Sequence, residues 1–177
     1  MEQRGTRLPG TNKIRFRCRT QTYWIEGSIS TLSRRLADFL NSDAARQTVM
    51  AEDASVMTVR DGQTAKMAIG NTSISTATIL LATPVEDAPR PPDLAIRSTR
   101  AMKRVIAGVG PYNIVGDVYL LKEATNRSVL LATEQRFIVV ADAVLTLANN
   151  PAFVQRYSAV CVNRQHVEFI SAVVPKE

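Results

Sequence analysis

Charged and apolar residues alternate one for one near the start of the chain, over residues 13–19 (KIRFRCR). In an extended strand, successive side chains point to opposite faces, so this alternation predicts a strand with two unlike faces. One face carries Lys13, Arg15, Arg17 and Arg19, and the other carries Ile14, Phe16 and Cys18. The pattern therefore predicts a strand with a cationic face.

Short β-branched runs separated by glycine, asparagine and charged residues continue along the chain, which predicts a mainly β protein. In the second half, these runs are residues 113–121, 127–133, 136–147, 158–163 and 166–174. In the first half, Asp61-Gly62 predicts a hairpin turn between residues 55–59 and 64–69. Helix is expected only in short pieces, over residues 33–47 and over residues 150–157, which follow the start signal of Pro151.

Two parts of the chain repeat one pattern at an offset of 89 residues. An offset that recurs at three separated places indicates an internal duplication of about 80 residues per copy. Two short strands of convergent sequence are the alternative. Gly27 and Gly116, set within apolar runs, predict a bend or bulge in each copy. The matched pairs are residues 23–29 with 112–118, Asp53-Ala54 with Asp142-Ala143, and Arg15 with Arg104.

Four of the eight prolines fall within residues 83–96, where they disfavour a sheet interior and indicate a linker. We therefore divide the chain into a basic arm, a first repeat, a Pro-rich linker and a second repeat. The expected fold is two small β-barrels in tandem with short helices. The boundaries are residues 1–12, 13–83, 84–96 and 97–177.

Composition is that of a packed globular protein, with 177 residues, 45% of them hydrophobic, and a net charge of +6. The positive charge is concentrated in residues 1–20 and 90–104, which is a pattern typical of contact with a polyanion. No apolar run reaches the roughly 18 residues of a membrane span, and the first ten residues lack the apolar core of a signal peptide. We therefore expect a cytoplasmic protein.

Residues that could support catalysis are few. His166 is the single histidine, so one chain cannot supply a two-histidine metal site, and Cys161 lies five residues away, on the opposite face of a continuous strand. Asp53 and Asp142 could form a carboxylate pair, but we expect each to act as a turn former. The two cysteines, Cys18 and Cys161, lack metal spacing and are expected to be buried thiols. We expect a non-enzymatic protein without metal or cofactor.

Binding of RNA or single-stranded DNA is the most specific function that the residues indicate. Cationic side chains on a strand can follow phosphates, and exposed aromatic rings can stack on unpaired bases. Trp24 and Tyr112 could stack on bases or pack in the core. An acidic protein, an anionic membrane surface or plain solvent exposure are alternatives for the basic strand. The expected binding residues are Lys13, Arg15, Arg17, Arg19, Tyr23, Arg100, Lys103, Arg104 and Arg164.

Four short motifs follow one another in a fixed order, namely a glycine, an Asp-x-x-Asn stretch, an Asp-Ala pair and a final strand with Asn-Arg. Together they resemble the Sm-like small barrel, which implies an RNA-facing loop and assembly into a homo-oligomer. The insert between Gly27 and Asp53 is longer than in that family, and the closing Arg-Gly turn is missing. The residues are Gly27, Asp38 to Asn41 and Asp53-Ala54 in the first copy, and Gly116, Asp142-Ala143 and Val162 to Arg164 in the second.

Arg-x-x-x-Arg occurs in both copies, as Arg15 to Arg19 and as Arg100 to Arg104. With residues 31–36 and 126–131, these motifs are similar to PilZ-type barrels, which bind cyclic di-GMP. Both later motifs end in leucine where that family has a glycine that lets the backbone approach the ligand. The resemblance therefore implies the fold without cyclic di-GMP as a partner.

The chain also resembles a bacterial family with one or two such units. A self-associating module is the second functional hypothesis, and a degenerate sensor is the third.

Overall fold

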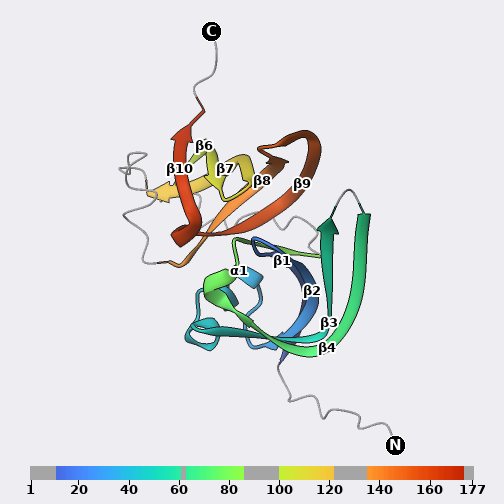
Figure 1. Cartoon of the computed structure of the whole chain (residues 1–177). Helices are drawn as coiled ribbons and strands as arrows, with labels where there is room; N and C mark the ends of the chain where they lie inside the picture. Colours follow the sequence, from blue (N-terminus) through green and yellow to red (C-terminus); the bar gives the residue numbers. More distant parts are fainter. Residues whose placement is uncertain (1–10, 61–62, 86–99, 122–134, 174–177) are drawn as a thin grey trace, which may run out of the picture.

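The computed structural model describes residues 11–60, 63–85, 100–121 and 135–173, and its strands form one antiparallel sheet of ten strands (Figure 1). The strand order is β10-β6-β7-β8-β9-β5-β1-β2-β3-β4. The predicted mainly β class is confirmed. Strands β1 to β5 are Asn12–Arg19, Trp24–Thr31, Thr48–Arg60, Gln63–Ser75 and Leu81–Pro84. Strands β6 to β10 are Arg100–Val109, Tyr112–Leu121, Phe137–Leu147, Asn150–Asn163 and Val167–Ala172.

Helical structure in the described residues is short, as predicted. The helix α1 (Leu36–Leu40) buries Leu36, Phe39 and Leu40, so the apolar spacing noted over residues 33–47 does form a helix face. Three short 3-10 helices are Asp43–Ala45, Thr76–Thr78 and Arg164–His166. None of the helices in the described ranges has the length and apolar character needed to cross a membrane.

The helix predicted over residues 150–157 is wrong, because these residues form the first part of β9. Gln155 lies opposite Leu145 of β8, and the ladder runs almost without interruption to Asn163. Side chains alternate here with a period of two, since Phe153, Gln155 and Tyr157 are partly buried while Val154 and Arg156 are exposed. The predicted hairpin turn at residues 61–62, the run at residues 127–133 and most of the predicted linker lie outside the described residues.

The two halves of the sheet repeat the same strand order, β5-β1-β2-β3-β4 and β10-β6-β7-β8-β9. The register between β2 and β3 shifts at Gly27, and the register between β7 and β8 shifts at Gly116. Across from these shifts, Asp53 and Asp142 are the two non-glycine residues with positive φ among those described, at 50° and 45°. The repeated pattern in the sequence therefore corresponds to a repeated bulge. The expectation that these aspartates form turns after strands is wrong, because both lie within β3 and β8.

The core consists of two clusters, and each takes side chains from both halves of the chain. The first fills the space around α1 and β1 to β5, and it also contains Phe137 and Cys161. The second lies under β6 to β10 and includes Leu80 and Leu81. Pairing of β5 with β9 joins the halves, with Leu81 opposite Val162. In Figure 1, the strands of the first half bend around α1, and β6 to β10 form the upper body.

The sheet is not closed, so the described strands form one continuous open sheet in place of two separate closed barrels. Strands β4 and β10 lie at its two ends. Each has one strand partner among the described residues, β3 for β4 and β6 for β10. The sequence pattern could not show this, because alternation defines the faces of a strand and leaves its neighbours undefined.

Candidate functional site

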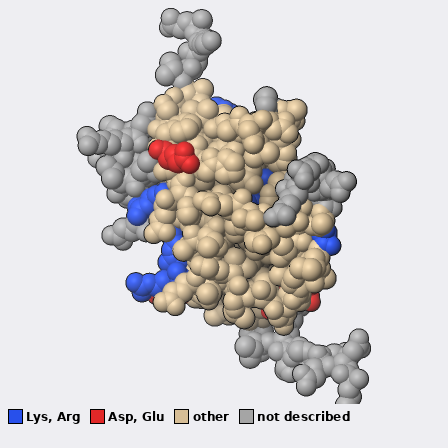
Figure 2. Space-filling view, in the orientation of Figure 1, with Lys and Arg blue, Asp and Glu red and all other residues tan. Residues whose placement is uncertain are grey.

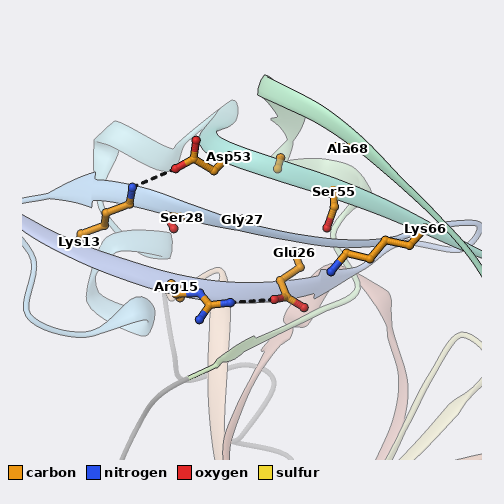
Figure 3. A pocket seen from close by; sticks show the side chains of 10 residues that line it. Lys13, Arg15, Glu26, Gly27, Ser28, Asp53, Ser55, Lys66 and Ala68 are labelled. Atoms are coloured by element: carbon orange, nitrogen blue, oxygen red, sulfur yellow. Dashed lines mark hydrogen bonds and ion pairs between the residues drawn. The ribbon is translucent and has the colours of Figure 1, made fainter. Parts of the chain in front are cut away.

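An open groove of about 600 Å³ lies on the outer face of β1 to β4 (Figure 3). Three cations and two carboxylates line it, together with two hydroxyl groups and small residues. In Figure 3 the side chains of Arg15 and Lys66 reach toward Glu26 from opposite sides. The lining residues are Lys13, Arg15, Glu26, Gly27, Ser28, Asp53, Ala54, Ser55, Lys66 and Ala68.

The alternation of residues 13–18 creates this outer face. Phe16 and Cys18 are fully buried in the first core cluster, which turns Lys13 and Arg15 to the opposite side of β1. This part of the predicted cationic face is confirmed. Beside it, Gly27 carries no side chain at the bulge, and a Cβ there would lie 3.2 Å from the carbonyl oxygen of Glu52. At this bulge the backbones of β2 and β3 therefore approach closely, and Gly27 lines the groove without a side chain.

Glu26 of β2 holds two guanidinium groups of β1. Arg15 Nη2 donates to Glu26 Oε1 at 3.1 Å, and Arg17 Nη2 donates to Glu26 Oε2 at 2.8 Å. The hydrogen bond from Arg17 is the main cause that lowers the pKa of Glu26 below its ordinary value of 4.5. Glu26 is therefore ionised at neutral pH and fixes the orientation of both arginines.

Lys13 binds the carboxylates at the other end of the groove. Its Nζ donates to Asp53 Oδ2 at 3.1 Å and lies 3.5 Å from Glu52 Oε2. The hydrogen bond to Asp53 raises the pKa of Lys13 above its ordinary value of 10.5. Asp53 lies at the bulge of β3, where its φ is 50° and its side chain is 79% exposed.

Lys66 of β4 supplies a further cation to the groove, and sequence reasoning missed it. In the part of the chain that the structure describes, it has no carboxylate within ion-pair distance. The residue sits in an alternating run, residues 64–69, whose polar positions predict one outward face. That signal places Lys66 on a face, but it does not reveal that β4 borders the same groove as β1.

Arg19 does not belong to the exposed cationic face, although the alternation predicts it there. It is 2% exposed, and its Cζ lies 3.9 Å from the ring centre of Trp24, 5.2 Å from that of Tyr112 and 5.5 Å from that of Phe153. Its Nη2 donates to Tyr157 Oη at 2.8 Å and to Gln155 Oε1. Aromatic side chains from the second repeat therefore cover this end of β1, so Arg19 cannot contact a phosphate.

The remaining predicted binding residues are not brought to the groove. Tyr23 is 45% exposed and precedes β2, whereas Tyr112 is buried and accepts a hydrogen bond from Trp24 Nε1 at 3.2 Å. Arg104, the repeat counterpart of Arg15, has its Nη1 3.3 Å from Asp117 Oδ1 on β7. Three further residues lie in the second half: Arg100 and Lys103 on β6, and Arg164 on the 3-10 helix that follows β9.

The motifs that resemble PilZ-type barrels do not form a common site in the first repeat. Arg15 faces the groove and Arg19 is buried among aromatic rings, so the two guanidinium groups have different surroundings. Thr31 and Leu36, which bound the second motif, are both buried. The counterpart at residues 126–131 lies outside the described residues.

Chemically, the groove offers fixed N–H donors, one ammonium without an ion pair among the described residues, and two serine hydroxyls. His166 is not among the residues that line the groove, and its Nε2 forms a hydrogen bond with the carbonyl oxygen of Ala77 at 2.7 Å. Figure 2 shows a face on which Lys and Arg gather along one side, while most of that face carries no charged side chain.

Comparisons with protein-family models, with curated proteins and with solved structures give no match to the chain.

Proposed function

We propose that this chain is a non-enzymatic binding protein whose groove holds a polyanion, with single-stranded RNA or DNA as the preferred class. The observation that carries the proposal is the convergence of Lys13, Arg15 and Lys66, from both ends of a four-stranded segment, on one open groove. Phosphate groups are bound most often by guanidinium and ammonium donors, which supply affinity without reading sequence.

The ion pairs within the groove are exposed to solvent. Arg15 Nη2 donates to Glu26 Oε1 at 3.1 Å, and the Arg15 side chain is 49% exposed. Surface ion pairs contribute only about 0–1 kcal/mol, so a phosphodiester group, which carries one negative charge like a carboxylate, can replace a carboxylate as the partner of a cation. Lys66 attracts Glu26 from beyond ion-pair distance, so it can bind a phosphate without breaking an ion pair among the described residues.

An exposed ring near the basic strand favours a single strand over a duplex. Tyr23 is 45% exposed, immediately precedes β2, and lies three residues before Glu26 in the sequence, in the turn that joins β1 to β2. Bases that are unpaired can stack on such a ring, whereas paired bases in a duplex cannot. Arg17 lies directly opposite Glu26 in the β1–β2 ladder, so it continues the row of cations on β1 toward this turn.

Fluorescence anisotropy of labelled single-stranded RNA and DNA of equal length, titrated across a salt series, tests the proposal. We expect the logarithm of the affinity to fall linearly with the logarithm of the salt concentration, by about 0.7 for each phosphate contact. Lys66→Glu should reduce that slope by roughly one contact. Arg156→Glu is the matched control, since Arg156 is exposed on β9 and carries the same charge change away from the groove.

Equal losses in the two variants would show that only net charge matters and would exclude the groove as the binding site. Absence of binding to either oligonucleotide at low salt would overturn the proposal altogether. A Tyr23→Ala variant separates the two classes of contact, because loss of stacking should lower affinity without changing the salt slope.

A further inference from the structure

The two strands at the ends of the sheet are repeat counterparts of two strands that already pair inside the chain. In the first repeat the order is β5-β1-β2-β3-β4, and in the second it is β10-β6-β7-β8-β9. Strand β10 therefore corresponds to β5, and β4 corresponds to β9. Since β5 pairs with β9 at the junction of the repeats, the same pair of edges lies at the two ends of the sheet, where neither has a second strand partner among the described residues.

The register of the ladders gives this correspondence residue by residue. On one side, Cys18 lies opposite Ala82 in the first repeat, and its counterpart Ala107 lies opposite Ile170 in the second. Ile170 is thus the counterpart of Ala82. At the junction, Ala82 lies opposite Cys161 of β9.

The other edge is matched in the same way. Val139 of β8 lies opposite Cys161, and its counterpart Met50 of β3 lies opposite Ser73 of β4. Ser73 is therefore the counterpart of Cys161. If the junction is repeated between two molecules, Ser73 of one chain lies opposite Ile170 of the next.

We propose that β4 of one molecule pairs in antiparallel fashion with β10 of a second copy, in the register that places Ser73 opposite Ile170. The contact is head-to-tail, because two different edges of the same chain meet. Contacts of this kind close into rings or continue as filaments. Unpaired backbone N–H and C=O groups along an edge provide the hydrogen bonds.

The exposed side chain of Phe169 on β10 fits an occupied surface better than a solvated one. Phe169 of β10 is 47% exposed, and in this register it faces Ile74, the counterpart of Val162. Its ring also lies against Gly108, where an added Cβ would come within 2.2 Å of a ring carbon. An edge strand that carries an exposed aromatic ring is typical of strand addition by another chain.

The pairing leaves the groove open. In this register the six residues of β10 face the end of β4 around Ser73, while Lys66 lies at the other end of that strand. Self-association is therefore independent of the polyanion proposal, and it should proceed without nucleic acid and with little dependence on salt.

Cysteine crosslinking tests the register directly. Thr72 and Ser171 form the next opposed pair in the proposed ladder, both are polar, and opposed residues bring their Cβ atoms within about 4.5–5.5 Å. We expect nuclease-treated Thr72→Cys/Ser171→Cys protein to give a ladder of disulfide-linked oligomers on mild oxidation. The native cysteines, Cys18 and Cys161, are buried and should not contribute.

The control moves one cysteine along β10 and keeps the other in place. Thr72→Cys/Glu168→Cys separates the two sulfurs by three residues of strand, roughly 10 Å, and should give little crosslinking. Crosslinks in Thr72→Cys alone would indicate pairing of β4 with β4 and would overturn the head-to-tail contact. Light scattering of the wild type should show a mass that rises with concentration above the 19.5 kDa of one chain. A constant monomer mass together with no ladder would also overturn the proposal.

Discussion

The guanidinium of Arg19 lies over the indole of Trp24, with 3.9 Å between Cζ and the ring centre, and the two residues face each other across β1 and β2. Tyr112 and Phe153 of the second repeat complete the surroundings of this cation. Among the described residues no carboxylate pairs with Arg19, and its buried Nη1 has no hydrogen-bond partner. Aromatic faces and two polar side chains therefore stabilise a buried charge that joins the repeats.

Removal of Arg19 should destabilise the fold at this junction. We expect Arg19→Ala to lower the free energy of unfolding by about 2–4 kcal/mol, because it leaves a cavity and removes hydrogen bonds. Arg19→Met should cost less, since it fills the space and also removes the desolvation penalty of the charge. Urea denaturation followed by circular dichroism measures both.

Arg156→Ala is the control for this measurement, because an exposed substitution should stay within about 0.5 kcal/mol of the wild type. If Arg19→Ala also stays within that range, the aromatic cluster does not hold the repeats together.

The two bulge glycines should respond differently to the same substitution. A Cβ on Gly116 would lie 2.6 Å from the carbonyl oxygen of Ala141, whereas a Cβ on Gly27 would approach backbone and side-chain atoms no closer than 3.2 Å. Gly116→Ala should therefore cost about 1–3 kcal/mol through overpacking, and Gly27→Ala should stay within about 1 kcal/mol of the wild type. Thermal unfolding of the two variants compares them, and equal losses would contradict the stated contacts.

Backbone conformation at Asp142 gives a third prediction. Its φ of 45° lies in the left-handed region, which asparagine and aspartate tolerate and β-branched residues avoid. Asp142→Val should lower stability by roughly 1–2 kcal/mol, while Asp142→Asn and Asp142→Gly should be close to neutral. The side chain is exposed, so lost packing does not enter the comparison. Chemical denaturation of the three variants would contradict the prediction if valine were tolerated as well as asparagine.

Acid should weaken the fold through Glu26. Its pKa is lowered in the folded state, mainly by the hydrogen bond from Arg17, so its contribution to stability is complete above the ordinary value of 4.5. That contribution is lost as the pH falls below 4.5 and through the lower pKa of the folded state. Melting temperatures measured from neutral pH into acid should therefore drop more steeply for the wild type than for Arg17→Gln. Parallel curves for the two proteins would show that the ion pair does not contribute.

Much of the local structure follows from residues that are close in sequence. The alternation of residues 13–18 assigns Phe16 and Cys18 to the core and Lys13 and Arg15 to the outside, because the side-chain period of a strand is two. The offset of 89 residues likewise anticipates the two bulges at Gly27 and Gly116, since only a repeated local geometry keeps the same glycine and aspartate spacing. These features depend on the backbone of a few neighbouring residues.

Features that depend on distant residues could not be predicted. Arg19 continues the alternation without a break, yet Tyr112, Phe153 and Tyr157 bury it, and these belong to strands far along the chain. Lys66 lines the same groove as Lys13 and Arg15 only because β2 and β3 lie between β1 and β4 in the sheet, which places β4 on the opposite side of the groove from β1. The open ends at β4 and β10 depend on the pairing of β5 with β9. Periodicity determines which way a side chain points from its strand, but packing between strands decides whether that side meets solvent, a ligand or another part of the protein.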